Sequence, residues 1–408
     1  MTQAPLSSVR VLELSRILAG PWAGQTLADY GAEVIKVEKP EAGDDTRRWG
    51  PPFLKDEQGA ETTDSAYFLS ANRGKKSITV DIRTPAGQAV IRDLAARCDV
   101  LIENYKVGGL KKYQLDYPHI KAINPKIIYC SITGFGQNGP YAHRPGYDFL
   151  LQGMGGLMGV TGERDDLPGG GPQKVGVALT DILTGMYAVT AIQAALIERD
   201  RSGTGQHIDL ALLDVQVACL ANQASNYLIG GEAPGRLGNA HPNIVPYQTS
   251  AASDGYFILA VGNDDQFRRF CEVAGCPDLS SDERFSSNQE RVRYRQQLNE
   301  LLAPIIKTRC CADWLSDLEE AGVPCGPVNN IDQVFENPQV QHRQMRIELD
   351  HPENPQTPGV ANPVKYSKTP IVYESAPPTL GQHTQQVLSE VLDYSPERIT
   401  ELQSDSAI

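Results

Sequence analysis

Hydrophobic and polar positions along the first third of the chain follow two alternating patterns. Short apolar runs of strand length are followed by longer segments with helical spacing, and Gly, Pro or Asp stands at many of the boundaries. Short connections between a strand, a helix and the next strand predict βαβ units, and hence a doubly wound, mainly parallel α/β sheet. The expected strands are 9–14, 33–38, 77–82, 100–103, 126–132 and 207–213, and the expected helices are 19–30, 85–98 and 117–123.

The pattern changes around residue 200, and a second domain is expected from about residue 226. We predict a large domain over 1–225 and a smaller α+β domain over 226–330, with a loop rich in Gly, Pro and Asn at 232–246 near the start of the smaller domain. The pattern alone does not place the Pro-rich remainder, 331–408. The elements expected from residue 215 onward are helices at 215–228, 264–274, 290–306, 312–321 and 382–392, and strands at 255–261 and 364–367.

One helix, expected over 175–197, is apolar nearly all round and is therefore predicted to be buried. It is long enough to span a bilayer, but Asp181 and Gln193 interrupt it, which favours a core helix. Asp181 lies near its start, where Asp is among the best N-capping residues. Taken alone, the helix favours a capping role for Asp181 over a chemical one.

Composition indicates which partners, which metal or disulfide sites and which cell compartment to expect. The net charge of −13 over 408 residues argues against nucleic acid and anionic membrane as partners. Eight Cys without Cys-x-x-Cys pairs and seven His without a His-Glu-x-x-His motif predict neither a metal site nor a disulfide framework. The first residues lack the basic and apolar regions of a signal peptide, so we expect a cytoplasmic enzyme.

Several stretches could carry chemistry, and each also has a simple structural explanation. The loop at 15–21 opens a helix and favours an anion, but it is not the Gly-x-Gly-x-x-Gly loop of nicotinamide sites. The stretches 72–77 and 104–112 each hold three cations and no acid, which suits phosphates, although charge runs are more often solvated surface. No Gly-x-Ser-x-Gly, Cys/His or Walker pattern is present. A carboxylate nucleophile, Asp181, is the chemistry that remains.

An ordered set of motifs then resembles one family. These motifs are VLELS at 11–15, AGP at 19–21, LADYGAEVIKVE at 27–38, NY at 104–105, SITGFGQNGP at 131–140 and ALTD at 178–181. Together they resemble class III CoA-transferases, the family of formyl-CoA and carnitine CoA-transferases. GDDTR at 43–47, WGPP at 49–52, NYLIG at 226–230, IVPYQ at 244–248 and GPVNN at 326–330 resemble those members that use succinyl-CoA as donor and a dicarboxylate such as glutarate as acceptor.

The resemblance implies a mechanism and an assembly. Asp181 matches the family nucleophile, which forms a mixed anhydride with the acyl group and then an aspartyl-CoA thioester. Coenzyme A is then a substrate, and neither a metal nor a permanent cofactor is required. The helix N-terminus is expected to hold Asp181 ionised, and N–H groups of a glycine loop to stabilise each oxyanion. The family's interlocked homodimer of ring-like chains implies that 331–408 return to the large domain.

The resemblance also implies binding residues. Lys39 and Lys112 stand where formyl-CoA transferase has Arg, so they keep the charge but lose the bidentate fork. For the acceptor carboxylate, the candidates are Arg16, Arg47, Arg48 and His241, and Tyr147 is a further substrate-binding candidate. The CoA contacts that carry over are Leu18, Ala19, Lys39, Asn72, Arg73, Lys75, Asn104, Tyr105, Lys106 and Lys112.

Two alternatives stay open. An α-methylacyl-CoA racemase of the same fold would pair an Asp with the His of a Gly-His-Asp triplet, but the triplet here has Tyr147 in that place, so one proton-transfer partner is missing. A CoA-binding module without catalysis would need Asp181 to be only a helix cap.

Overall fold

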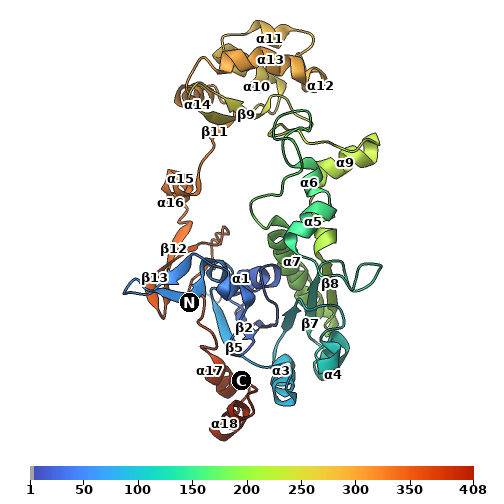
Figure 1. Ribbon diagram of the computed structural model, residues 1–408, viewed down its shortest axis with the longest axis vertical. Helices are drawn as coiled ribbons and strands as arrows, with labels where there is room; N and C mark the ends of the chain where they lie inside the picture. The colour runs from blue at the N-terminus through green and yellow to red at the C-terminus, as the bar shows by residue number, and fades with distance from the viewer. Residues whose placement is uncertain (1–3) are drawn as a thin grey trace. The chain divides into compact units, whose positions relative to one another are not determined.

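The computed structural model describes residues 4–408, and the chain divides into two compact units (Figure 1). Unit 1 comprises Met1–Gly155, Gly176–Cys219 and Pro338–Ile408, and unit 2 comprises Gly156–Val175 and Leu220–Asn337. The domain boundaries expected from the sequence, 225 and 330, stay predictions. The division by contacts falls a few residues away from each, and it also places 156–175 with unit 2.

Unit 1 is built on a six-stranded sheet in which every neighbouring pair of strands is parallel. Along the sheet the order is β5-β2-β1-β6-β7-β8. The chain therefore starts in the middle, adds β2 and β5 on one side of β1, and then adds β6, β7 and β8 on the other side, so the strand order reverses between β1 and β6. All residues of β6 and β7 are buried, as expected for strands covered on both faces. The strands are β1 (Arg10–Glu13), β2 (Glu33–Glu38), β5 (Lys75–Thr79), β6 (Val100–Glu103), β7 (Ile128–Thr133) and β8 (His207–Ala211).

Helices cover both faces of this sheet. Neighbouring residues of each strand point to opposite sides, so the apolar strands contribute side chains to a core on each face. Leu12 and Ile35 belong to one core and Val11 and Val34 to the other. Residues of α3 (Pro85–Arg97), α4 (Tyr117–Ile123), α17 (Thr384–Glu390) and α18 (Pro396–Ser404) fill the first core, and residues of α1 (Ala19–Asp29), α7 (Leu179–Ser202) and α8 (Leu212–Ala218) fill the second. This arrangement is the predicted mixed α/β fold with a central parallel sheet.

Helix α7 is buried along one face only. The expectation of a helix buried all round is therefore wrong for this chain, since Tyr187 is 46% and Ile197 63% exposed. Among the described residues it is the one helix long and apolar enough to cross a membrane, and half of that window is buried within the structure. Its buried face packs on α1 through Gly185, where an added Cβ would lie 2.8 Å from the Ala19 carbonyl oxygen.

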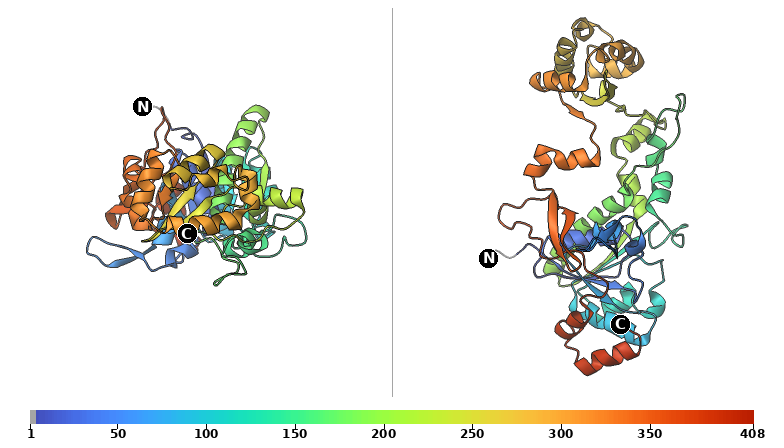
Figure 2. Two further views of the ribbon diagram at one scale, coloured as in Figure 1. Left: turned by 90° about the horizontal axis from the view of Figure 1, so that it is seen from above. Right: turned by 60° about the vertical axis from the view of Figure 1, so that its left-hand side comes forward.

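The C-terminal segment completes unit 1. Helices α17 and α18, red in Figure 2, lie against the part of the unit that holds α3. The Ala407 carbonyl accepts a hydrogen bond from the Asp81 N–H at 2.8 Å. The remaining elements of unit 1 are β3 (Phe53–Lys55), β4 (Glu61–Ser65), α2 (Ala66–Leu69), α5 (Asp148–Met154), α16 (Pro338–His342), β12 (Arg346–His351), β13 (Asn354–Val360) and the 3-10 turns η1 (Asp45–Arg48) and η2 (Lys111–Tyr113).

Unit 2 has a three-stranded antiparallel sheet, ordered β11-β10-β9, with helices packed around Trp314 and Phe257. Its strands are β9 (Tyr247–Ala251), β10 (Tyr256–Ala260) and β11 (Cys325–Pro327). Its helices are α6 (Leu157–Val160), α9 (Ala221–Gly230), α10 (Asp264–Val273), α11 (Asp278–Ser281), α12 (Asn288–Arg293), α13 (Arg295–Ile306), α14 (Cys311–Glu320) and α15 (Ile331–Glu336).

Three expected elements differ from the structure. The helix predicted at 215–228 is two helices, α8 and α9, because Ala221 has a φ of 48°. The helix predicted at 290–306 is likewise two, α12 and α13, which meet at Tyr294. The strand predicted at 364–367 is wrong, since these residues form no strand.

Candidate functional site

A cavity of about 750 Å³ lies at the carboxyl ends of the parallel strands in unit 1. Its walls come from the loops that follow β1, β2, β5, β6 and β7, together with the first turns of α1 and α7. The strand order reverses between β1 and β6, and open α/β sheets bind ligands at such a reversal. The volume is in the range of small-molecule sites. The cavity is therefore the first candidate for a ligand site.

Asp181 reaches this cavity from the first turn of α7. Among the described residues its carboxylate has no hydrogen bond and no ion pair. Burial, and then the negative charge of Asp148, raise the pKa of Asp181 to about 7. Both causes act against the ionisation that the helix N-terminus is expected to favour, so the expectation of an ionised Asp181 stays a prediction.

Asp148, at the start of α5, occupies the capping position that Asp181 might have taken. The Thr180 N–H donates to Asp148 Oδ1 at 2.9 Å, and Gln152 Nε2 donates to Asp148 Oδ2 at 2.7 Å. Thr180 Oγ1 in turn donates to Gln216 Oε1 at 2.7 Å. Since Asp148 serves the helix terminus, the carboxylate of Asp181 is left free to react.

Exposed cations line the wall of the cavity that the loops after β2 and β6 form. Lys39, Lys106 and Lys112 are exposed, and none of them has an ion pair within residues 4–408. Their charges suit the phosphates of a nucleotide-like ligand. Arg83, which follows β5 and is paired with Asp81 at 2.6 Å, also lines this wall. Sequence reasoning missed Arg83, although its place just after a parallel strand is the signal that could have found it.

The remaining predicted residues divide into those that the cavity includes and those that it does not. Leu18, Ala19, Asn104 and Tyr105 line the cavity, as do Arg16 and Tyr147. Arg48 lines it as well, so the structure brings eleven of the predicted site residues, Asp181, Lys39, Lys106 and Lys112 among them, to one place. Each stands on a loop after a strand or in the first turn of a helix.

Asn72, Arg73 and Lys75 do not line the cavity. They lie at or before the amino end of β5, whereas the cavity lies at the opposite, carboxyl ends of the strands. Arg73 is buried and paired with Asp29 at 2.7 Å, and Lys75 Nζ contacts Glu13 Oε2 at 2.9 Å and Asn72 Oδ1 at 2.9 Å. These contacts are structural, so the predicted CoA contacts of the three residues gain no support.

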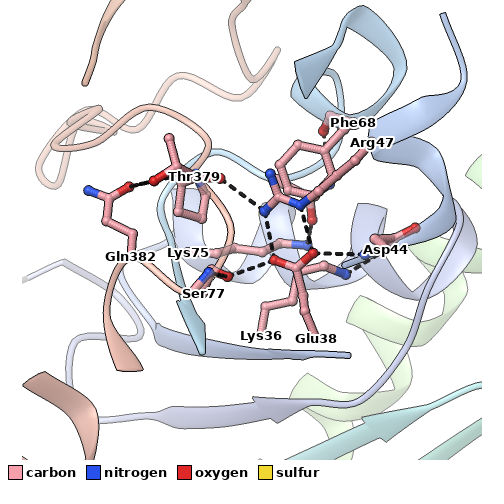
Figure 3. Close-up of polar contacts among 12 residues, drawn as sticks. Lys36, Glu38, Asp44, Arg47, Phe68, Lys75, Ser77, Thr379 and Gln382 are labelled. Atoms are coloured by element: carbon pink, nitrogen blue, oxygen red, sulfur yellow. Dashed lines mark hydrogen bonds and ion pairs between the residues drawn. The ribbon is translucent and has the colours of Figure 1, made fainter. Parts of the chain in front are cut away.

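Two predicted acceptor residues, Arg47 and His241, are not among the residues that line the cavity. Arg47 is buried and bound to Glu38 at 2.7 Å, with Phe68 against its guanidinium (Figure 3). It is also paired with Asp64. Its charge is already neutralised, so it does not offer a free fork to a carboxylate. His241 belongs to unit 2, where its Nδ1 accepts from the Asn243 N–H at 3.1 Å.

The fold and the cavity together define an α/β protein that presents one half-buried carboxylate and a group of exposed cations to an anionic ligand. The sequence pattern described as CoA-transferase family III matches residues 6–384. The chain belongs to this family, and it is therefore an enzyme that transfers coenzyme A, with CoA thioesters as substrates.

Similar proteins cover nearly the whole chain. A succinate–glutarate CoA-transferase of Agrobacterium fabrum is 54% identical over 387 residues, which cover 95% of this chain and 96% of that protein. The human succinyl-CoA:glutarate CoA-transferase is 46% identical, with coverage of 99% and 90%. The crystal structure of a CAIB/BAIF family protein from Brucella suis, 52% identical, superposes with a TM-score of 0.84 and covers 96% of this chain and 100% of that one.

Proposed function

We propose that this enzyme moves CoA from succinyl-CoA to glutarate. The single observation that supports this most strongly is the 54% identity, over nearly all of both chains, to a succinate–glutarate CoA-transferase. The printed activity of the human relative supports the same pair of substrates. The cavity adds the physical requirements: exposed cations for the phosphates of CoA and an unpaired carboxylate for the acyl group.

The proposed chemistry exchanges one bond at each step. Asp181 Oδ attacks the thioester carbonyl of succinyl-CoA, the C–S bond breaks, and a succinyl–aspartyl anhydride and CoA thiolate form. The thiolate then attacks the aspartyl carbonyl and releases succinate, which leaves an aspartyl-CoA thioester. Glutarate attacks this thioester to give a glutaryl–aspartyl anhydride and thiolate again. The thiolate takes the glutaryl group, so glutaryl-CoA leaves and the Asp181 carboxylate is restored without net proton transfer.

The binding roles follow from position in the cavity. Lys39, Lys106 and Lys112 hold the phosphates, while the backbone at Leu18 and Ala19 lies beside the acyl end of CoA. For the acceptor we retain Arg16, Arg48 and Tyr147, because all three line the cavity and are exposed. Arg16 is paired with Asp45, whereas Arg48 has no ion pair among the described residues. The racemase alternative loses ground because Tyr147 supplies no imidazole, and the binding-module alternative loses ground because Asp148, and not Asp181, caps α7.

We further propose the interlocked homodimer of the family. Its support within unit 1 is a set of large apolar side chains that one chain leaves exposed on α5, on α7 and just before each helix, since exposed apolar surface marks interaction sites. These are Tyr147, Phe149, Leu150, Met154, Val177, Met186, Tyr187 and Ile197. A cytoplasmic location also stays a prediction.

The decisive experiment traps the acyl-enzyme. Incubation with succinyl-CoA and hydroxylamine should convert Asp181 to a hydroxamate that peptide mass spectrometry locates, with loss of activity. Asp181→Ala should abolish transfer and trapping, since no other unpaired carboxylate is brought to the cavity by α7. Asp200→Asn is the matched control, because Asp200 is on the same helix with its side chain 79% exposed. Transfer by Asp181→Ala at the rate of the control would overturn the proposal.

A further inference from the structure

The turn that joins β1 to α1 contains a strained residue. Ile17 has a φ of 73°, in the left-handed region that a β-branched side chain rarely adopts. Such strain persists only where neighbouring groups hold the backbone in place, and it gathers at functional sites. Ile17 stands directly before Leu18 and Ala19, and all three line the cavity.

Hydrogen bonds from three side chains hold this turn. Asn104 accepts from the Arg16 N–H at 3.0 Å and donates to the Arg16 carbonyl at 2.7 Å. Lys36 Nζ donates to the Ser15 carbonyl at 3.0 Å. The Ile17 N–H itself lies 3.2 Å from Asp44 Oδ1 and 3.3 Å from Asp44 Oδ2. Asp44 is thus the one described side chain that contacts the backbone of the strained residue directly.

Hydrogen bonds and an ion pair hold the side chain of Asp44 in turn (Figure 3). It is 1% exposed, and its Oδ2 accepts from Lys36 Nζ at 2.9 Å. Its Oδ1 accepts from the Thr46 N–H at 3.0 Å and from Thr46 Oγ1 at 2.9 Å. Burial opposes ionisation, but the charge of Lys36 and the bonds from Thr46 outweigh it and hold the pKa of Asp44 below its ordinary value. A buried, ionised acceptor is well suited to hold a strained N–H.

Helix α1 starts immediately after this turn. Leu18 is its N-cap residue, and no side chain caps the helix. The conformation of Ile17 therefore sets the direction in which the backbone of Leu18 and Ala19 enters the cavity. If Ile17 relaxed to negative φ, this backbone would turn away from its present position.

We propose that Asp44 is a positioning residue that keeps Ile17 in the left-handed conformation, so that Leu18 and Ala19 face the CoA thioester. This inference rests on the proposed function of the cavity. Asp44 itself does not react. It acts through the backbone of the turn, and a misplaced turn is expected to weaken acyl-CoA binding and to slow the acyl transfer that depends on it.

A rescue experiment separates positioning from a merely structural role. Asp44→Ala removes the acceptor and should raise KM for succinyl-CoA by about tenfold or more. Ile17→Gly in the Asp44→Ala background should recover much of that loss, because Gly adopts positive φ without a clamp. The same double variant should not recover the melting temperature, since the lost contact with Lys36 stays lost. Asp44→Asn, which keeps an oxygen acceptor, should lie between Asp44→Ala and the natural enzyme.

Asp29→Ala is the matched control. It also removes a buried carboxylate from an ion pair, that with Arg73, but Asp29 does not line the cavity. It should lower the melting temperature while leaving KM for succinyl-CoA unchanged. If Asp44→Ala does not fold, Asp44→Asn with and without Ile17→Gly gives the same comparison with a smaller effect.

Two results would overturn the proposal: an unchanged KM in folded Asp44→Ala, or a raised KM that Ile17→Gly leaves unrecovered. Calorimetric titration of the natural enzyme with CoA alone distinguishes this from a failure of the proposed function. If the natural enzyme binds CoA and transfers it, only the role of Asp44 is refuted. If the natural enzyme neither binds CoA nor transfers it, the proposed function itself is refuted.

Discussion

At the scale of the residue, Asp181 and Asp148 form a pair of carboxylates with separate tasks. Asp148 is engaged by Thr180 and Gln152, whereas Asp181 is unpaired and has a pKa raised to about 7 by burial and by Asp148. A carboxylate with a raised pKa is more nucleophilic when ionised, but less of it is ionised at neutral pH. The pair therefore sets both the reactivity and the pH range of the enzyme.

This pair predicts a pH profile. Because the ionised form of Asp181 attacks, kcat/KM for succinyl-CoA should rise tenfold per pH unit below about pH 7 and level off above it. Asp148→Asn keeps an oxygen for the Thr180 N–H but removes the negative charge, so this limb should move to lower pH by about one unit or less. The limb should stay above the ordinary Asp range, since burial is the larger cause.

Stopped-flow rates across pH 5–9, a window of about four units around the expected midpoint, would measure the rise and the plateau of kcat/KM for the natural enzyme and for Asp148→Asn. Asp200→Asn, exposed at the far end of the same helix, should leave the midpoint where it is. A midpoint that does not move in Asp148→Asn would show that its charge plays no part in the ionisation of Asp181.

Residue types alone could not separate ligand-binding cations from structural ones. Lys75 and Lys106 both stand in short basic stretches, but Lys75 is the first residue of its strand and is buried against Glu13, whereas Lys106 follows its strand and is exposed. The ordered family motifs brought out Asp181, and its place in the cavity fits that role. Which basic stretch faces the ligand depends on the end of the strand at which it lies in the folded sheet. The sequence pattern alone does not assign each cation to one end.

At the scale of the element, the parallel strands and their crossover helices were predictable because short apolar runs alternate with segments of helical spacing, and the residues of β6 and β7 are all buried. The hairpin β12–β13 was not, because its second strand, with two Pro and a Gly, carries no alternating apolar pattern. The break between α8 and α9 was missed because Ala221, a good helix former, occupies a left-handed conformation there. Tertiary contacts override local preference at such points.

The contact between α1 and α7 predicts a stability effect. A Cβ at Gly185 would lie 2.8 Å from the Ala19 carbonyl oxygen and 3.1 Å from the Trp22 side chain. Gly185→Val should therefore force the helices apart and lower the free energy of unfolding by about 1–3 kcal/mol. Urea unfolding followed by circular dichroism measures this change. Gly159→Ala, where an added Cβ has open space, should cost no stability, and equal losses in both variants would contradict close packing at Gly185.

At the scale of the whole molecule, one chain leaves large apolar side chains of α5 and α7 in water, as Phe149 and Tyr187 show. A helix that is apolar nearly all round but buried on one side in a single chain needs a second surface to cover the other side. The sequence predicted the apolar character of α7, and the resemblance implied the partner. The pattern of a single chain does not reveal which chain covers the exposed face.

The proposed dimer predicts a measurable mass. Light scattering after gel filtration should give about 89 kDa, twice the 44.5 kDa of one chain. Tyr187→Glu places a charge on the exposed apolar face of α7 and should shift the enzyme toward monomers, with a lower melting temperature. Asp200→Asn serves again as the control on this helix. A natural enzyme of 44.5 kDa at micromolar concentration would refute the assembly.

The discontinuity of unit 1 has a consequence for biosynthesis. Strands made early, such as β5, share a core with Val387, Leu388 and Leu402, which the ribosome adds much later. Until the final segment emerges, the nascent protein carries an uncovered hydrophobic surface that invites chaperones or aggregation. A premature stop codon even a few turns before Ala407, which is fully buried, should therefore yield inclusion bodies in place of a shortened enzyme.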